Sequence, residues 1–169
     1  KFDATGKLLM QFGKGGRGNG QFKFPHGIAV ANDGSIFVVD KLNSRVQKFD
    51  SKGIFIRKWG QVGSGNGQFH GPNGIAIDSD DNIYIADTHN QRVQKFNAYG
   101  TYIKAWGWGG QTRDWRTSYD RAGSSRDGEF HYPFDVALDR ENNVYVTDYR
   151  NSRIQKFDSA GKFLAKWGS

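Results

Sequence analysis

The stretch Arg45-Val46-Gln47-Lys48-Phe49 decides the fold, because the chain repeats it twice. It recurs as Arg92-Val93-Gln94-Lys95-Phe96 and, with one change, as Arg153-Ile154-Gln155-Lys156-Phe157. The first two copies lie 47 residues apart. Self-similarity at a fixed period of this length is typical of propellers and other repeat architectures. We therefore expect one structural unit per repeat.

Each repeat contains four short runs that are rich in β-branched and aromatic residues, which we name strands a to d in chain order. In the first repeat they are Gly27–Val30, Ser35–Val39, Arg45–Phe49 and Ile54–Trp59. Short segments of Asn, Asp, Ser and Gly separate the runs, as in hairpin loops. Four antiparallel strands at this period describe one blade of a β-propeller. The sequence therefore predicts an all-β chain built as a β-propeller of four-stranded antiparallel blades.

Three motifs in each repeat resemble those of a known family. They are Pro25-His26-Gly27-Ile28-Ala29-Val30, Ile83-Tyr84-Ile85-Ala86-Asp87 and Asn90-Gln91-Arg92-Val93-Gln94-Lys95-Phe96. The pattern resembles the NHL-repeat β-propeller family, and the resemblance covers nearly the whole chain. It implies a propeller, commonly with six blades, and some members of the family bind single-stranded RNA on a positively charged face.

The repeats divide the chain into segments of unequal length. They are a blade tail at 1–13, blades at 14–60, 61–107 and 126–169, and an insertion at about 108–125. Residues 1–13 align with strands c and d alone, so the chain holds three complete blades and strands c and d of another. We expect an incomplete ring with exposed packing faces at both ends. The remaining blades would come from the rest of a longer chain or from another copy.

Composition limits the classes of function. The chain has no Cys, which excludes disulfides and Cys-ligated zinc. No run of apolar residues is long enough to cross a membrane, so membrane insertion is not expected. The formal net charge of +7 favours a polyanionic partner. We expect no cofactor.

An Asp, an Asn and an Arg recur around the b–c connection of every blade. They are Asp40, Asn43, Arg45, Asp87, Asn90, Arg92, Asp148, Asn151 and Arg153. Such a set resembles a catalytic cluster, but residues that every blade carries are expected to serve the blade. The carboxylate can pair with the Arg and with turn amides across the hairpin.

Blade topology places the d–a and b–c connections on one face, which we call the d–a/b–c face. The candidate ligand-binding residues on it are Lys14, Arg17, Lys23, His26, Lys41, His70, His89, Trp115, Arg116, His131, Tyr149 and Arg150. Basic side chains exceed acidic ones here, whereas the opposite face is acidic. The sequence therefore predicts a non-catalytic binding module whose basic, aromatic face holds a protein, peptide or glycan, with single-stranded RNA as a further candidate.

Two other functions remain open. Peptide-amidating lyases resemble NHL propellers, and Pro25-His26-Gly27 matches their zinc-binding Pro-His motif. The equivalent residues Asn73 and Phe134 cannot replace His, so His26 is a metal ligand only if that interpretation holds, and no enzyme activity is expected. A structural or sensor module at a microbial cell surface is the third possibility, and it favours an extracellular location.

The acidic a–b loop Asp78-Ser79-Asp80-Asp81-Asn82 has the oxygen atoms that a calcium ion prefers. The corresponding loops of the other blades differ in charge. We expect a solvated acidic turn there instead of a calcium site.

Overall fold

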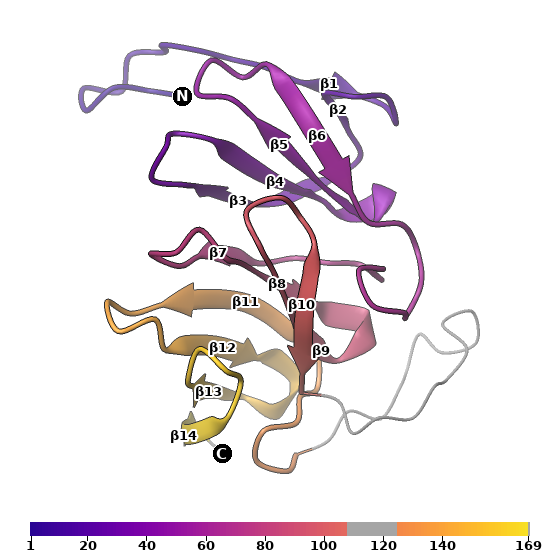
Figure 1. Cartoon of the computed structure of the whole chain (residues 1–169), viewed down its shortest axis with the longest axis vertical. Helices are drawn as coiled ribbons and strands as arrows, with labels where there is room; N and C mark the ends of the chain where they lie inside the picture. Colours follow the sequence, from indigo (N-terminus) through magenta and orange to yellow (C-terminus); the bar gives the residue numbers. More distant parts are fainter. Residues whose placement is uncertain (108–124, 169) are drawn as a thin grey trace.

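The computed structural model describes residues 1–107 and 125–168. Three four-stranded antiparallel sheets pack one after another along the chain (Figure 1). This architecture confirms the predicted all-β class with four-stranded antiparallel blades. Nearly all of the predicted insertion, including Trp115 and Arg116, lies outside the described residues.

Each blade takes its four strands in chain order. Blade 1 contains β3 (Pro25–Val30), β4 (Ile36–Asp40), β5 (Arg45–Phe49) and β6 (Phe55–Trp59). Blade 2 contains β7 (Ile75–Ile77), β8 (Ile83–Asp87), β9 (Arg92–Phe96) and β10 (Tyr102–Trp106). Blade 3 contains β11 (Pro133–Leu138), β12 (Val144–Asp148), β13 (Arg153–Phe157) and β14 (Phe163–Gly168). The four strands of a blade correspond to strands a to d of the sequence repeat.

A one-turn helix forms each b–c connection, which the sequence pattern did not predict. The three are η1 (Lys41–Asn43), η2 (Thr88–Asn90) and η3 (Tyr149–Asn151). Each ends at a residue in the left-handed conformation, namely Ser44, Gln91 or Ser152. This tight turn carries the chain from β4 directly back into β5, and it fixes the loop residues on the d–a/b–c face.

The core lies between blades, because consecutive sheets pack face to face. Phe37 of blade 1 and Ile83 and Phe96 of blade 2 belong to one buried cluster. Trp59 at the end of strand d packs against Phe96 of the next blade, with ring centroids 6.0 Å apart. The same ring leaves no room for a side chain at Gly100 in the next c–d turn. The recurring aromatic residue at the end of strand d therefore joins consecutive blades.

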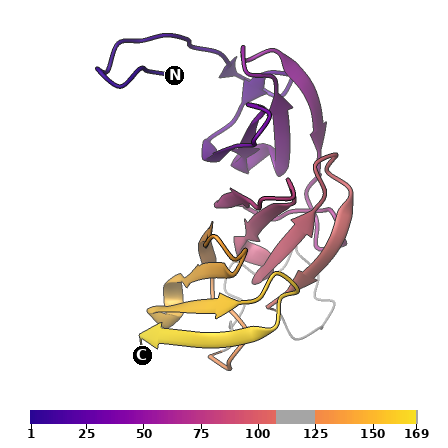
Figure 2. The same ribbon diagram turned by 60° about the vertical axis from the view of Figure 1, so that its left-hand side comes forward.

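The three blades follow an arc (Figure 2), and packing faces are exposed at both of its ends, as the repeat count led us to expect. Ile75 of blade 2 is 7% exposed, whereas its equivalent Ile28 in blade 1 is 63% exposed. At the other end, Ile154 is 43% exposed although its equivalent Val93 is fully buried. The blades follow an arc with the two chain ends at its opposite ends, which is an incomplete ring.

Residues 1–13 form a hairpin with a single bridge, between Phe2 and Leu8, in place of two regular strands. In the three blades strand c pairs with strand b on its inner side, and residues 1–13 have no such neighbouring strand among the described residues. The turn nevertheless matches the other c–d turns, since Asp3 accepts backbone N–H groups from Thr5 and Lys7. Phe12 packs on Phe49 at 4.9 Å, in the manner of the tryptophans.

The glycine-rich d–a linker of blade 1 also contains two very short strands. They are β1 (Lys14–Gly15) and β2 (Gln21–Phe22), and they pair in parallel. The linker is thereby folded back on itself beside the b–c connection.

Candidate functional site

A buried carboxylate organises the loops of the d–a/b–c face in each blade. In blade 1 the Asp40 carboxylate accepts hydrogen bonds from Arg45 Nε and Asn43 Nδ2, both at 2.8 Å. It also accepts the backbone N–H of Lys23 at 2.7 Å and Gln47 Nε2 at 3.3 Å. Asp40 is fully buried, so these charge-assisted bonds replace the water that it lost.

The Arg of this network ties the b–c connection to the glycine-rich linker. Arg45 donates from its two terminal nitrogens to the carbonyl oxygens of Arg17, Gly18 and Gln21 at 2.7–2.8 Å. Equivalent bonds recur in the other two blades around Asp87, Asn90, Arg92, Asp148, Asn151 and Arg153. Burial raises the pKa of Asp87, and the positive charge of Arg92 offsets part of this rise. The nine recurring residues therefore hold the two loops of the face together.

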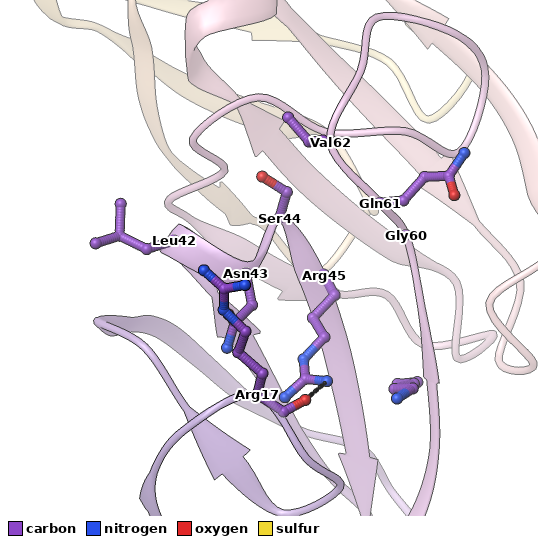
Figure 3. Close-up of a pocket in the computed structure, with 9 residues that line it drawn as sticks. Arg17, Leu42, Asn43, Ser44, Arg45, Gly60, Gln61 and Val62 are labelled. Carbon is purple, nitrogen blue, oxygen red and sulfur yellow. Dashed lines mark hydrogen bonds between the residues drawn. The ribbon is translucent and has the colours of Figure 1, made fainter.

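The first depression on this face, the blade-1 hollow, has a volume of about 520 Å³. Its lining residues are Arg17, Leu42, Asn43, Ser44, Arg45, Lys58, Gly60, Gln61 and Val62. Figure 3 shows the Arg45 side chain directed at the Arg17 carbonyl, with the Arg17 side chain beside it. Arg17 and Lys58 are exposed, and no carboxylate of the described residues forms an ion pair with either. Among the described residues, the two cations of the hollow therefore have no acidic partner.

A second depression, the histidine hollow, adjoins the first and has a volume of about 250 Å³. Its lining residues are Lys41, Leu42, Ser44, Val62, His70, Gly71 and His89. Leu42, Ser44 and Val62 line both hollows, so the two form one continuous depression between blades 1 and 2.

The two histidines of this hollow lie against one another, with ring centroids 4.9 Å apart. Burial lowers the pKa of His89 to about 4, and the nearby charges of His70, Lys41 and Arg150 act in the same direction. His89 is therefore neutral at pH 7. Its ring fits because residue 71 is Gly with a φ of 56°, and a side chain there would collide with it. The equivalent residues Phe24 and Tyr132 share this backbone conformation but carry aromatic rings.

Aromatic rings continue the depression across blades 2 and 3. Tyr132 contacts the His89 ring at 5.2 Å, and the Arg150 guanidinium lies 4.3 Å from the Tyr132 ring centre. His131 is 5.6 Å from the same ring.

Phe134 is a second ring that several polar side chains contact. It contacts His26 at 5.1 Å and Tyr149 at 6.0 Å, and the Lys41 ammonium lies 5.9 Å from its centre. Cations and rings thus alternate from blade 1 to blade 3, in an arrangement suited to flat or anionic groups.

The structure brings together most of the candidate residues that it describes. Lys41, His70 and His89 share one hollow, and Arg17 lines the other. Lys14 and Lys23 line neither hollow. Trp115 and Arg116 lie outside the described residues.

The sequence pattern missed one cation of the site. Lys58 belongs to the outer strand β6 and was not among the candidate residues, yet it lines the blade-1 hollow. Its place near the end of strand d, two residues before Gly60, was the available signal, because that glycine opens the d–a connection.

On the opposite face, the expectation of a solvated acidic turn is wrong for its first residue. Asp78 is only 5% exposed, and it accepts hydrogen bonds from Asn82 Nδ2 and the Tyr84 hydroxyl, both at 2.9 Å. A buried carboxylate at this position caps its own turn. Burial and the bond to Asp78 raise the pKa of the Tyr84 hydroxyl.

Within residues 1–107 and 125–168, no three His, Cys, Asp or Glu side chains lie together in a way that could hold a metal ion. His26, His70 and His131 form no such group. In the same part of the chain, no helix has the length and apolarity needed to span a membrane.

Two family models match the chain. One, described as a 6-bladed beta-propeller, matches residues 25–107, and the NHL repeat matches residues 130–157. The chain belongs to the NHL-repeat β-propeller family. The resemblance expected from the repeated motifs is thereby confirmed, and the incomplete ring corresponds to part of a six-bladed propeller. No curated protein matches this NHL propeller.

Solved structures show the same fold at low sequence identity. A streptogramin B lyase has a TM-score of 0.60 and 20% identity, over 84% of this chain and 39% of that one. A catalytically inactive virginiamycin B lyase from Staphylococcus aureus with Quinupristin has a TM-score of 0.63 and 13% identity, over 99% and 47%. Kuenenia stuttgartiensis hydrazine synthase has a TM-score of 0.63 and 12% identity, over 92% and 39%. The NHL propeller described here spans less than half of each of these chains.

Proposed function

We propose that this chain is a non-catalytic binding module whose d–a/b–c face holds an acidic segment of a partner protein. The observation that supports this most strongly is the continuous depression between blades 1 and 2, whose rim carries Arg17, Lys58 and Lys41. Positive side chains around a concave surface raise the local concentration of an anionic ligand and orient it.

The character of the lining favours a peptide over a bare ion. Leu42 and Val62 are 50% and 47% exposed where the two hollows meet. An acidic segment that also carries apolar side chains can use both kinds of surface. The neutral His89 and the ring of Tyr132 extend this surface toward blade 3.

The rigidity of the face supports a role in recognition. The loops are held by buried Asp–Arg pairs in each blade, such as Asp40–Arg45 at 2.8 Å. A preorganised surface binds without the cost of ordering its loops, which increases affinity for a given contact area.

The test is the affinity of a fluorescein-labelled hexaglutamate peptide, measured by fluorescence anisotropy as salt is increased. Charge-mediated binding weakens as salt screens the cations. Neutralising Lys41 or Arg150 with Gln should weaken binding about three- to fivefold each, the effect of one exposed charge pair. Arg57→Gln is the matched control, because Arg57 lies on the outer strand β6, lines neither hollow and packs over Tyr99.

Binding that is indifferent to salt and to both substitutions would refute the proposal. A hexauridylate that binds more tightly than hexaglutamate would replace the peptide by single-stranded RNA as the ligand. A neutral oligosaccharide that binds more tightly would exclude the role of the cations.

A further inference from the structure

The three blades are equivalent in fold, but the d–a linker position just before a recurring glycine carries a charge in only one of them. Gly20, Gly67 and Gly128 each donate their N–H to the side chain of the recurring Gln, at 2.9–3.0 Å. The residues just before them, which are Asn19, Asn66 and Asp127, therefore occupy equivalent positions.

In blade 3 this position holds an anion. The Asp127 carboxylate lies 2.6 Å from Lys166 Nζ and 3.8 Å from the terminal nitrogen of Arg153. Lys166 belongs to β14, the outer strand, and Arg153 belongs to the recurring Asp–Arg pair. The blade itself thus shows where a carboxylate is held between the outer-strand Lys and the network Arg.

Blade 1 has the same cations without that carboxylate. Lys58 is the equivalent of Lys166, and Arg45 is the equivalent of Arg153. Asn19 stands in place of Asp127, and Arg17 adds a further cation to the hollow. Blade 1 therefore has the groups that hold an anion in blade 3, and its own anion is missing from the sequence.

Blade 2 lacks the equivalents of both Lys58 and Arg17, which makes it an internal control. Ala105 replaces the outer-strand Lys, and Ser64 replaces Arg17. The linker residue is Asn66, as in blade 1. The fold does not require cations at these positions, because blade 2 has none there. The presence of Lys58 and Arg17 in blade 1 therefore needs another explanation.

We infer that the blade-1 hollow is a carboxylate subsite, in which an acidic side chain of a bound peptide takes the place that Asp127 takes in blade 3. This rests on the proposed function, since it names the part of the d–a/b–c face that receives the acidic segment. Lys58 and Arg17 are the primary contacts. Arg45 contributes its charge while it remains bonded to Asp40.

The test uses the substitution that fills the subsite from within the chain. Asn19→Asp copies blade 3 and should pair with Lys58, so we expect hexaglutamate to bind about tenfold more weakly, because the new carboxylate both occupies Lys58 and repels the ligand. Lys58→Ala and Arg17→Ser copy blade 2 and should each weaken binding about three- to fivefold.

Asn66→Asp is the matched control, because it adds the same charge to an equivalent linker in a blade that has Ala105 in place of Lys58. Asn66 lines neither hollow. We therefore expect Asn66→Asp to change the affinity less than twofold. Circular dichroism melts of each variant show whether the fold is retained, and Asn19→Asp adds an ion pair without removing a contact of the core.

The outcomes separate the two claims. If hexaglutamate binds the unmodified protein but Asn19→Asp and Asn66→Asp have equal effects, the subsite is refuted and the binding face stands. If hexaglutamate does not bind at all, both are refuted. If Asn19→Asp weakens the binding of hexauridylate but not of hexaglutamate, the hollow holds phosphate, and the assignment to a peptide carboxylate is wrong.

Discussion

The Asp78–Tyr84 pair offers a stability test in which blade 1 supplies the reference. Asp78 and Tyr84 are 5% and 0% exposed, and their side chains are hydrogen bonded at 2.9 Å. At the equivalent positions blade 1 has Ala31 and Phe37, so the carboxylate and the hydroxyl are absent together. The perturbation is Asp78→Ala, alone and combined with Tyr84→Phe.

The single substitution removes the acceptor and leaves the Tyr84 hydroxyl buried without it. An unsatisfied buried polar group costs about 1–3 kcal/mol, and the turn amides that Asp78 bonds are also released. We expect Asp78→Ala to lower the free energy of unfolding by about 2–3 kcal/mol.

Adding Tyr84→Phe should recover at least about 1 kcal/mol of that loss, because no buried hydroxyl then needs a partner. Two contacts survive in the double variant. The first is the contact of Lys95 with the ring of residue 84, 4.8 Å from the ring centre. This contact does not need the hydroxyl, since the equivalent Lys48 lies 5.0 Å from the ring of Phe37 in blade 1. The second is the hydrogen bond from the backbone N–H of residue 78 to the carbonyl oxygen of Asn82, which does not depend on either side chain.

Urea unfolding of the four proteins of the cycle, followed by tryptophan fluorescence, measures the coupling. With a slope of about 2 kcal/mol/M, Asp78→Ala should lower the urea midpoint by about 1 M or more. Strictly additive effects of the two substitutions would refute the reasoning. So would a double variant less stable than Asp78→Ala alone.

Three further outcomes follow from the packing of the blades. The depressed pKa of His89, about 4 against 6.5 for the unfolded chain, means that the unfolded state binds the extra proton first. The stability that neutral His89 contributes is complete above pH 6.5 and is lost as the pH falls toward 4. The loss of stability between pH 7 and pH 4.5, measured by thermal melts, should therefore be smaller in His89→Leu by about 1–2 kcal/mol, a figure that allows for the partial exposure of the ring. Gly27→Ala places a methyl group 2.5 Å from the Asn73 carbonyl oxygen, and it should cost about 1–3 kcal/mol in urea unfolding. Trp59→Phe should cost less than about 2 kcal/mol, because Phe12 occupies the same place in the preceding hairpin and the buried Trp59 Nε1 makes no hydrogen bond.

Much of the fold could be predicted from the sequence because the blades repeat it. Strand c was predicted to the residue, since Arg45–Phe49 coincides with β5. The one-turn helix at Lys41–Asn43 was not predicted, because three residues carry no helical periodicity. The hairpin at residues 1–13 has the turn chemistry of strands c and d, but pairing depends on a neighbouring strand that a local pattern does not report.

The site was predictable in outline and less so in detail. Topology alone placed Lys41, His70 and His89 on one face. The burial of Asp78 depends on Tyr84 across the hairpin, so the acidic loop looked solvated when it was considered without that partner. The contribution of Lys58 depended on which side of β6 faces the linker.

The pairing of Lys166 with Asp127 was visible in the sequence only as a difference between blades. The two residues are separated by much of blade 3, and their contact depends on the register of β13 and β14. Once that contact is known, the combination of Lys58 with Asn19 distinguishes blade 1, because blade 2 has Asn66 without an equivalent of Lys58.

The most direct measurement of the central claim is a map of backbone amide chemical shifts during titration with hexaglutamate. Ligand on the d–a/b–c face should move the signals of Leu42, Ser44 and Val62, which line both hollows. The signals of Asp80 and Glu141 in the a–b loops of the opposite face should stay in place. Chemical-shift changes confined to the a–b loops or to the outer strands β6, β10 and β14 would contradict the account.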